Sequence, residues 1–264
     1  MLRLYHSNTS VCSIKVRLVL EEKGLAWDSE LLDLRRGDQH QAEYLKLNPN
    51  AVVPTLVHDS DTLIESSIIM QYLNDAFPEP LLMPSDDFRR AVARLWMKKL
   101  DDYLHEACST LSFAIAFRKI LLQKTPRELK TYFGNIPNPE ARKRQRLAVK
   151  QGLEAAHVAP ALRQYDKFLG EMESMLEQTH YLAGEGYTLA DAAVTPYVNR
   201  VVMLGMAESL VQRRPQLCAW LERMRARPTF DLAITNWFND ADRQRFAIPP
   251  EETAQKVRQV LKVG

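Results

Sequence analysis

Two short motifs in the first quarter of the chain carry residues that could bind a peptide and an anion. Val53 precedes Pro54, and Pro54 opens the apolar run Thr55–Val57, which is typical of a strand. If the bond before Pro54 is cis, the N–H and C=O of Val53 turn outward together and can pair with an extended peptide. Further on, Glu65 and Ser66 introduce a predicted helix; Ser66 could cap it, and a helix N-terminus binds anions.

These motifs lie in an alternation of predicted strands and helices that ends near residue 80. The pattern predicts strands at 2–5, 27–32, 55–57 and 62–64 and helices at 11–23, 42–47 and 66–76. This β-α-β-α-β-β-α order is that of a thioredoxin-like fold, although the chain has no Cys-x-x-Cys pair. We therefore predict a thioredoxin-like domain over residues 1–80.

After a proline-rich linker, the remaining pattern is helical throughout. We predict an all-helical domain over residues 88–264, interrupted by a non-helical break from Thr125 to Pro139, where three prolines fall close together. Thr188 and Asp191 have the spacing of a capping box at the start of one of these helices. The fold class is thus α/β plus all-α, with the division between residues 80 and 88.

The charge and the cysteine content of the chain limit which partners and which cellular compartment we expect. The net charge of +2 gives no electrostatic reason to bind nucleic acid or a membrane surface. No apolar run approaches the roughly 20 residues that span a bilayer, and no signal peptide is evident. Three widely spaced cysteines, an odd number, predict neither a disulfide framework nor a zinc site and fit the reducing cytoplasm.

The order of the motifs resembles that of the glutathione transferases, with their Asn-Pro, Val-Pro, Glu-Ser and Thr-x-x-Asp signatures. The resemblance covers essentially the whole chain and is carried here by Asn48-Pro49, Val53-Pro54, Glu65-Ser66 and Thr188-x-x-Asp191. The run from Ser10 to Arg17 is similar to the serine-type theta and zeta classes. The insert Phe133–Glu140 resembles, more loosely, that of the bacterial lignin β-etherases.

The resemblance implies that a side chain near the start of the first long helix activates the glutathione thiol. A thiol with a pKa of about 8.5 is mostly protonated at neutral pH, and lowering the pKa by about 2 units takes about 3 kcal/mol. Register with the serine-type classes selects Ser10, and register with the β-etherases selects Ser13. Cys12 is the third catalytic candidate, because a thiol in this position could form a mixed disulfide with glutathione.

The resemblance also assigns roles in binding glutathione. The backbone of Val53, ahead of Pro54, would pair with the cysteinyl part of the tripeptide. Glu65 would bind the γ-glutamyl ammonium group and Ser66 the carboxylate, while His40 would meet the glycyl carboxylate. An aromatic stripe in the first long helix, more typical of a core than of a pocket, adjoins the expected electrophile site; it comprises Trp96, Tyr103, His105 and Phe113.

The predicted function is therefore that of a cytoplasmic glutathione transferase active in detoxification, with glutathione as co-substrate and no metal. Its second substrate would be a small hydrophobic electrophile, such as a β-aryl ether or a halide. The resemblance implies a homodimer. Two alternatives remain open at this point: a non-enzymatic binding or assembly module with the same fold, and a glutathione-dependent disulfide reductase that uses Cys12.

Overall fold

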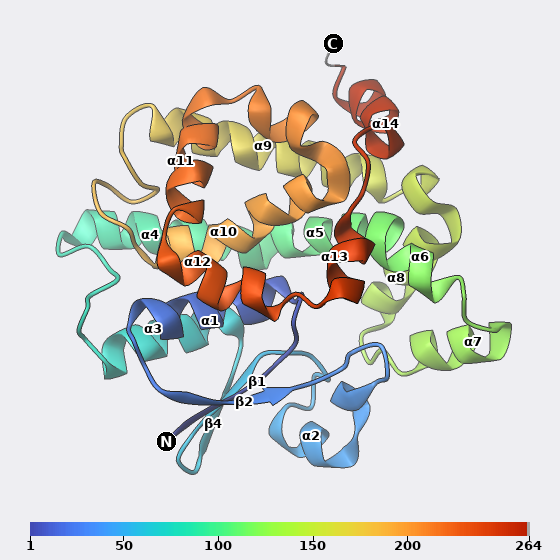
Figure 1. Ribbon diagram of the computed structural model, residues 1–264, viewed down its shortest axis with the longest axis horizontal. Helices are drawn as coiled ribbons and strands as arrows, with labels where there is room; N and C mark the ends of the chain where they lie inside the picture. Colours follow the sequence, from blue (N-terminus) through green and yellow to red (C-terminus); the bar gives the residue numbers. More distant parts are fainter. Residues whose placement is uncertain (263–264) are drawn as a thin grey trace.

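The computed structural model describes residues 1–262, and its first part is an α/β unit built on a four-stranded sheet (Figure 1). The elements are β1 (Leu2–His6), α1 (Val11–Glu22), β2 (Trp27–Leu31), α2 (Ala42–Leu47), β3 (Thr55–His58), β4 (Asp61–Ile64) and α3 (Ser66–Ala76). The predicted thioredoxin-like fold class is confirmed, and the predicted elements lie within one or two residues of the observed ones.

The sheet has the strand order β2-β1-β3-β4. β1 runs parallel to β2 and antiparallel to β3, so that Leu4 is paired with Ser29 on one side and with Leu56 on the other. Leu4 and Leu56 are fully buried, as expected for the central strands of a covered sheet. α1 and α3 lie on the side of the sheet that faces the helical part, which brings the start of both helices to the boundary between the two parts (Figure 1).

The second part is entirely helical among the residues that the structure describes. Its helices are α4 (Asp87–Lys99), α5 (His105–Ser112), α6 (Arg118–Leu121), α7 (Pro126–Gly134), α8 (Pro139–Gln151), α9 (Val158–Leu176), α10 (Leu189–Val201), α11 (Pro215–Arg225), α12 (Pro228–Ala233), α13 (Asp240–Phe246) and α14 (Glu251–Leu261). Two π-helical stretches, Leu100–Leu104 and Phe113–Phe117, join α4, α5 and α6 into one long path. The division predicted between residues 80 and 88 falls in the segment that connects α3 to α4.

The predicted non-helical break from Thr125 to Pro139 is wrong, because α7 occupies most of it. Thr125 caps this helix: its hydroxyl accepts from the N–H of Glu128 (3.3 Å), and the Glu128 carboxylate accepts from the N–H of Thr125 (2.7 Å). Pro126 occupies the first turn, where a missing N–H costs nothing. Pro126 is therefore the first residue of a helix and not a helix breaker.

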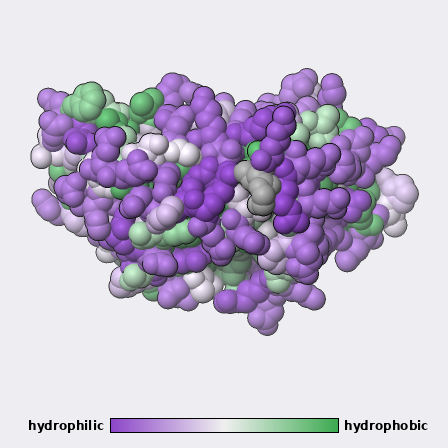
Figure 2. All heavy atoms as spheres, turned by 90° about the horizontal axis from the view of Figure 1, so that it is seen from above, coloured by the Kyte–Doolittle hydropathy of each residue, from purple (hydrophilic) through white to green (hydrophobic). Residues whose placement is uncertain are grey.

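The core is continuous across the two parts. α1 packs against α3 on one side and against α10 on the other, and α10 is buried along its whole length. By contrast, the face of the helical part shown in Figure 2 is mainly hydrophilic. No helix within residues 1–262 combines the length and the apolar character needed to cross a membrane.

Asp191 fixes the start of α10. Its buried carboxylate accepts from the N–H groups of Leu182 (3.1 Å) and Thr188 (3.0 Å), from the Thr188 hydroxyl (3.0 Å) and from the indole N–H of Trp220 (2.9 Å). The predicted capping box is thus observed, and the same carboxylate also ties α10 to α11 and to the preceding loop.

We expect Asp191→Ala to lower the free energy of unfolding by about 3–5 kcal/mol, because the substitution leaves several buried donors without an acceptor. Urea denaturation followed by circular dichroism measures the change. Glu185→Ala, an exposed carboxylate in the preceding loop, is the matched control and should change stability by less than about 0.5 kcal/mol. A similar, small change for both variants would contradict this role of Asp191.

Candidate active site

Two buried arginines hold the loop between β1 and α1. The Arg17 guanidinium, on α1, donates to the backbone carbonyls of Ser7 (3.1 Å) and Asn8 (2.9 Å). Arg200, on α10, donates to the carbonyl of Thr9. The loop that leads into α1 is therefore anchored from both parts of the molecule, and the candidate donors at the start of α1 are positioned by these contacts.

Ser10 and Ser13 face different surroundings. Ser10 is the N-cap of α1: its hydroxyl oxygen accepts from the N–H of Ser13 (3.2 Å), and the side chain is partly exposed. An accepting hydroxyl still has its own proton to donate. Ser13 is fully buried, and its hydroxyl accepts from the N–H of Ser7 (3.3 Å) beneath the loop. Of the two residues, Ser10 is the one that is partly exposed.

Cys12 lies on the first turn of α1, between groups from the helical part. Its sulfur is 3.5 Å from Nδ1 of His105 and 3.8 Å from the hydroxyl of Tyr197, and these two groups are 3.1 Å apart. Burial alone would raise the pKa of the Cys12 thiol, but the charge and hydrogen bond of His105, the charge of Lys15 and a hydrogen bond from Ser66 outweigh it and lower that pKa to about 6.

His105 and Tyr197 both favour their protonated forms, which stabilise a thiolate at Cys12. The thiolate of Cys12 raises the pKa of His105, in spite of the desolvation that opposes it, so the imidazole favours its charged form. Burial raises the pKa of Tyr197 well above its ordinary value, so its hydroxyl remains a donor. At pH 7, a thiol with a pKa of about 6 is roughly nine-tenths thiolate. Cys12 therefore has the chemistry of a nucleophile, and the side chain is partly exposed.

A buried lysine joins this cluster to the start of α3. Nζ of Lys15, which is fully buried, donates to the Ser67 hydroxyl (2.7 Å), and that hydroxyl donates to the carboxylate of Asp101 (3.0 Å). Lys15 and Asp101 are 3.5 Å apart. The pairing neutralises a charge that would otherwise be costly to bury. The sequence does not single out these residues or Tyr197, since nothing in their spacing indicates that α1, α3 and α10 meet here.

The turn before α3 differs in one detail from the prediction. The N-cap is Glu65, with φ +70°, and Ser66 is the first residue of the helix, so the prediction that Ser66 caps it is wrong. A left-handed backbone at a residue with a side chain costs about 1–3 kcal/mol and is found preferentially at functional sites. It leaves the Glu65 carboxylate exposed and the Ser66 hydroxyl beside Cys12.

The peptide bond between Val53 and Pro54 is cis, as the peptide-binding hypothesis requires. Val53 makes no backbone hydrogen bond to any other residue that the structure describes. The carbonyl of its neighbour Val52 is held instead, by the hydroxyl of Tyr44 (2.5 Å) and the amide of Asn48 (2.9 Å). The two polar side chains thus fix the loop, while the N–H and C=O of Val53 keep no partner among the described residues.

His40 ends a short 3₁₀ turn, and its Nε2 lies 3.1 Å from the amide nitrogen of Gln39. Desolvation lowers the pKa of His40 below the usual value, so the imidazole is largely neutral at pH 7. As a neutral group it could offer a hydrogen bond to a carboxylate but no charge.

The residues of the aromatic stripe in the first long helix belong partly to the core and partly to the site. Trp96 is buried edge-on against Phe168, with ring centroids 5.3 Å apart, and is a core residue. His105 faces Cys12. Phe113 is partly buried and contacts Phe117 at 5.1 Å, further along the same path.

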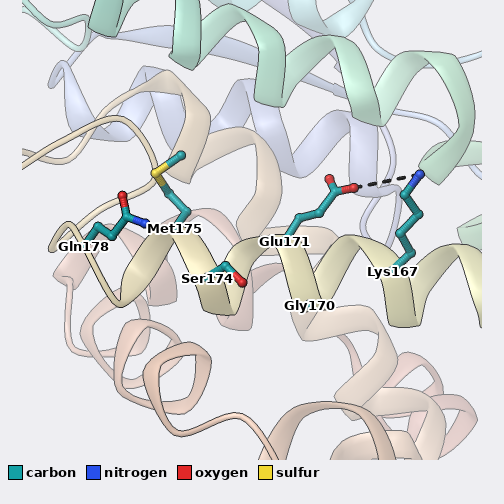
Figure 3. Close-up of a pocket in the computed structure, with 6 residues that line it drawn as sticks. All are labelled: Lys167, Gly170, Glu171, Ser174, Met175 and Gln178. Carbon is teal, nitrogen blue, oxygen red and sulfur yellow. Dashed lines mark ion pairs between the residues drawn. The ribbon is translucent and has the colours of Figure 1, made fainter.

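A depression of about 560 Å³ on the surface of α9 lies apart from these groups (Figure 3). Five of the six residues that line it belong to α9, and the sixth, Gln178, follows the end of that helix; Glu171 among them is paired with Lys167 and Lys99. None of the candidate site residues contributes to it.

Comparison with known proteins agrees with this architecture. The glutathione S-transferase N-terminal domain matches residues 4–81, and the C-terminal domain of the same family matches residues 139–228. The chain is 32% identical to Protein LigF of Sphingobium sp. (strain NBRC 103272 / SYK-6), over 92% of this chain and 95% of that protein. It is 30% identical to the tetrachloro-p-hydroquinone reductive dehalogenase of Sphingobium chlorophenolicum, over 89% and 96%.

Solved structures show the same similarity. The crystal structure of the beta-etherase LigF matches with a TM-score of 0.81, covering 88% of this chain and 98% of that one at 32% identity. Glutathione transferase F7 from Populus trichocarpa matches with a TM-score of 0.70 at 26% identity, covering 90% and 100%. The chain belongs to the glutathione S-transferase family. It is a glutathione transferase, and glutathione is its co-substrate.

We expect the Cys12 thiol to titrate with a pKa of about 6. His105→Ala should raise that pKa by about 1 unit or more, because the positive charge that most stabilises the thiolate is lost. The thiolate absorbance in the ultraviolet, measured against pH and corrected by subtracting the Cys12→Ala variant, gives the value. Burial raises the pKa of both Cys108 and Cys218, so neither thiol titrates in this range. An unshifted titration in His105→Ala would contradict the assignment.

Proposed function

We propose that this enzyme adds the thiolate of glutathione to a hydrophobic electrophile that carries an aryl ether or aryl halide. The observation that supports the proposal most directly is the arrangement of three features around the boundary of the two parts: the backbone of Val53, which has no hydrogen-bond partner among the described residues, the start of α3 at Ser66 and the partly exposed Ser10. These features can hold a peptide, receive its carboxylate and donate to its sulfur, respectively.

Ser10 is the proposed donor to the glutathione sulfur. Capping uses only the oxygen of the hydroxyl, so its proton stays available to donate. Ser10 also lies at the positive end of the α1 dipole. A hydroxyl donor and a helix N-terminus together can supply the roughly 3 kcal/mol that lowers the thiol pKa by 2 units. Ser13 is the weaker candidate because its hydroxyl is fully buried.

The proposed binding of glutathione follows the extended tripeptide. Val53, ahead of Pro54, pairs with the cysteinyl backbone, as a strand pairs with a sheet edge. The carboxylate of Glu65 receives the ammonium group, and the N-terminus of α3 at Ser66 receives the γ-glutamyl carboxylate. His40 donates a hydrogen bond to the glycyl carboxylate.

The proposed reaction is a substitution at carbon. The thiolate sulfur forms a bond to the carbon that bears the leaving group, and the carbon–oxygen or carbon–halogen bond breaks. The electron pair of that bond leaves with the oxygen as a phenolate, which takes a proton from water, or with the halogen as a halide. The names of the two relatives, a beta-etherase and a reductive dehalogenase, support these two leaving groups as the substrate classes to test.

A second activity is supported by Cys12 and its low pKa of about 6. Its thiolate can attack a glutathionyl disulfide, forming a Cys12–glutathione disulfide and releasing the other thiolate. A glutathione thiolate then attacks the sulfur of the bound glutathione, which releases glutathione disulfide and restores Cys12. The Ser66 hydroxyl favours this exchange by helping to lower the pKa of the Cys12 thiol.

We also propose that the chain forms a homodimer through α3 and α4. Phe88 and Leu95 lie two turns apart on one face of α4 and are 73% and 54% exposed, and Ile68 on α3 is 51% exposed. Large apolar side chains that share an exposed helix face are typical of an interface.

The two candidate nucleophile systems are separable by mutation. We expect Ser10→Ala to lower kcat/KM for conjugation of glutathione to a chlorodinitrobenzene by about 10- to 100-fold, because the sulfur loses its donor. Cys12→Ala should leave conjugation within about threefold but abolish reduction of a mixed disulfide of glutathione and hydroxyethyl thiol. Ser174→Ala, an exposed serine on α9, is the control for both assays. A loss of conjugation in Ser13→Ala but not in Ser10→Ala would assign the donor to Ser13.

We expect Leu95→Lys to convert the dimer into a monomer, because a charge would replace an apolar contact in the interface. Light scattering coupled to gel filtration at micromolar concentration reports the mass. Leu122→Lys places the same charge on another exposed leucine, 47% exposed after α6, and should leave the dimer intact. A wild-type chain with the mass of a monomer would contradict the proposal.

A further inference from the structure

The imidazole ring of His105, at the start of α5, is held by one of its two nitrogens. Nδ1 lies 3.5 Å from the sulfur of Cys12 and 3.1 Å from the hydroxyl of Tyr197. Tyr197 is fully buried within α10, and its ring meets that of His105 edge-on, with centroids 6.2 Å apart. The orientation of the imidazole is therefore fixed from α1 and from α10 together.

Nε2, the opposite nitrogen of the ring, has no hydrogen-bond partner among residues 1–262. His105 is an exposed residue, so a ligand at the boundary of the two parts can reach it. When the protein holds one ring nitrogen and leaves the other free, the free one can exchange a proton with a substrate. The geometry thus leaves Nε2 of His105 without an assigned role.

The groups that face His105 favour the imidazolium, which carries a proton on both nitrogens. The Cys12 thiolate raises the pKa of His105 most, and the carboxylate of Asp101 adds to the rise. Desolvation and the charge of Lys15 act in the opposite direction but do not prevail. Tyr197 is neutral, because burial raises the pKa of its own hydroxyl well above the usual value. Nε2 therefore keeps its proton to a higher pH than the nitrogen of an ordinary histidine.

His105 is close to the place proposed for the glutathione sulfur. Ser10, the proposed donor to that sulfur, comes two residues before Cys12, so the Cα atoms of these two residues are at most about 7 Å apart. Ser66, where the γ-glutamyl carboxylate would bind, also hydrogen-bonds to Cys12. In a substitution at carbon, the leaving group lies on the opposite side of the attacked carbon from the sulfur. An electrophile between α1 and α5 can therefore direct its leaving group to Nε2.

We propose, on the basis of the proposed function, that His105 is the general acid that protonates the oxygen of the aryl ether as it leaves. The glutathione sulfur forms a bond to carbon, and the carbon–oxygen bond breaks. The electron pair of that bond stays on the oxygen and takes the proton of Nε2, so the product leaves as a neutral phenol. The imidazole then regains a proton from water, which is the final source of the phenol proton.

The leaving group decides whether this proton is needed. A phenol has a pKa near 10 and an imidazolium a pKa near 6.5, so proton transfer from imidazolium to phenolate is favoured by about 3 pKa units. A halide leaves as a stable anion and needs no proton. The choice of leaving group therefore separates this role of His105 from any effect that His105 has on Cys12 or on the fold.

Kinetics of the full-length protein with glutathione and three electrophiles test the proposal. Two are aryl ethers that differ only in the leaving phenol, 4-methoxyphenol in one and the more acidic 4-nitrophenol in the other, and the third is chlorodinitrobenzene. We expect His105→Gln to lower kcat for the methoxyphenyl ether by about 100-fold or more. The loss should be less than tenfold for the nitrophenyl ether and less than threefold for chlorodinitrobenzene, with the KM for glutathione unchanged.

The pH profile gives a second readout. In the wild type, kcat for the methoxyphenyl ether should fall as the pH rises through the pKa of His105, because the acid is then deprotonated. This fall should be absent from His105→Gln. His157→Gln, an exposed histidine before α9 without a side-chain cap bond, is the matched control and should behave as the wild type does.

Two results would overturn the role of His105. Equal losses of kcat with all three electrophiles in His105→Gln would show that the residue acts on the fold or on glutathione and not on the leaving group. His105→Asn serves for the same comparison if His105→Gln unfolds, as judged by circular dichroism. A wild type that turns over chlorodinitrobenzene but neither ether would overturn the role of His105 alone, whereas a wild type that turns over none of the three would overturn the proposed function with it.

Discussion

The site depends on the hydrogen bonds that the buried guanidinium of Arg17 makes to the loop ahead of α1 and to α12. It has no carboxylate partner among the described residues and is satisfied by the carbonyls of Ser7, Asn8 and Ala233 and by Nδ1 of His6. Burial lowers the pKa of Arg17 to about 9, which leaves it charged at neutral pH. Because α12 supplies one of these acceptors, the guanidinium joins the loop ahead of α1 to the helical part, and the position of every candidate donor follows from it.

The same anchoring explains why two kinds of sulfur chemistry can meet on one turn of helix. Ser10 and Cys12 are both at the start of α1, but Ser10 needs only its own helix to be a donor, whereas Cys12 needs another part of the chain. His105 comes from α5, and its charge and hydrogen bond are the largest of the effects that lower the Cys12 pKa to about 6, ahead of Lys15 and Ser66. A helix start alone would not overcome the desolvation of the thiol.

The motifs that could be identified from the sequence were local ones. The capping box of Thr188 and Asp191 lies within four consecutive residues and is observed, and the bond before Pro54, for which the sequence allows a cis geometry, is cis. The start of α3 is also where the sequence predicts it, but its N-cap is Glu65 and not Ser66. A proline has two local meanings, since it can end a helix or begin one. The prolines near Pro126 predict a break, but the capping threonine before Pro126 makes it the first residue of α7.

By itself, the sequence determined the α/β part, the helical character of the rest and the order of the glutathione-binding motifs, because strand alternation, caps and X-Pro bonds act between near neighbours. Only the tertiary structure decided which side chains surround Cys12 and how Lys15 is neutralised by Asp101. The physical reason is that pKa values and charge balance depend on distances across packed elements, and no spacing along the chain encodes those distances.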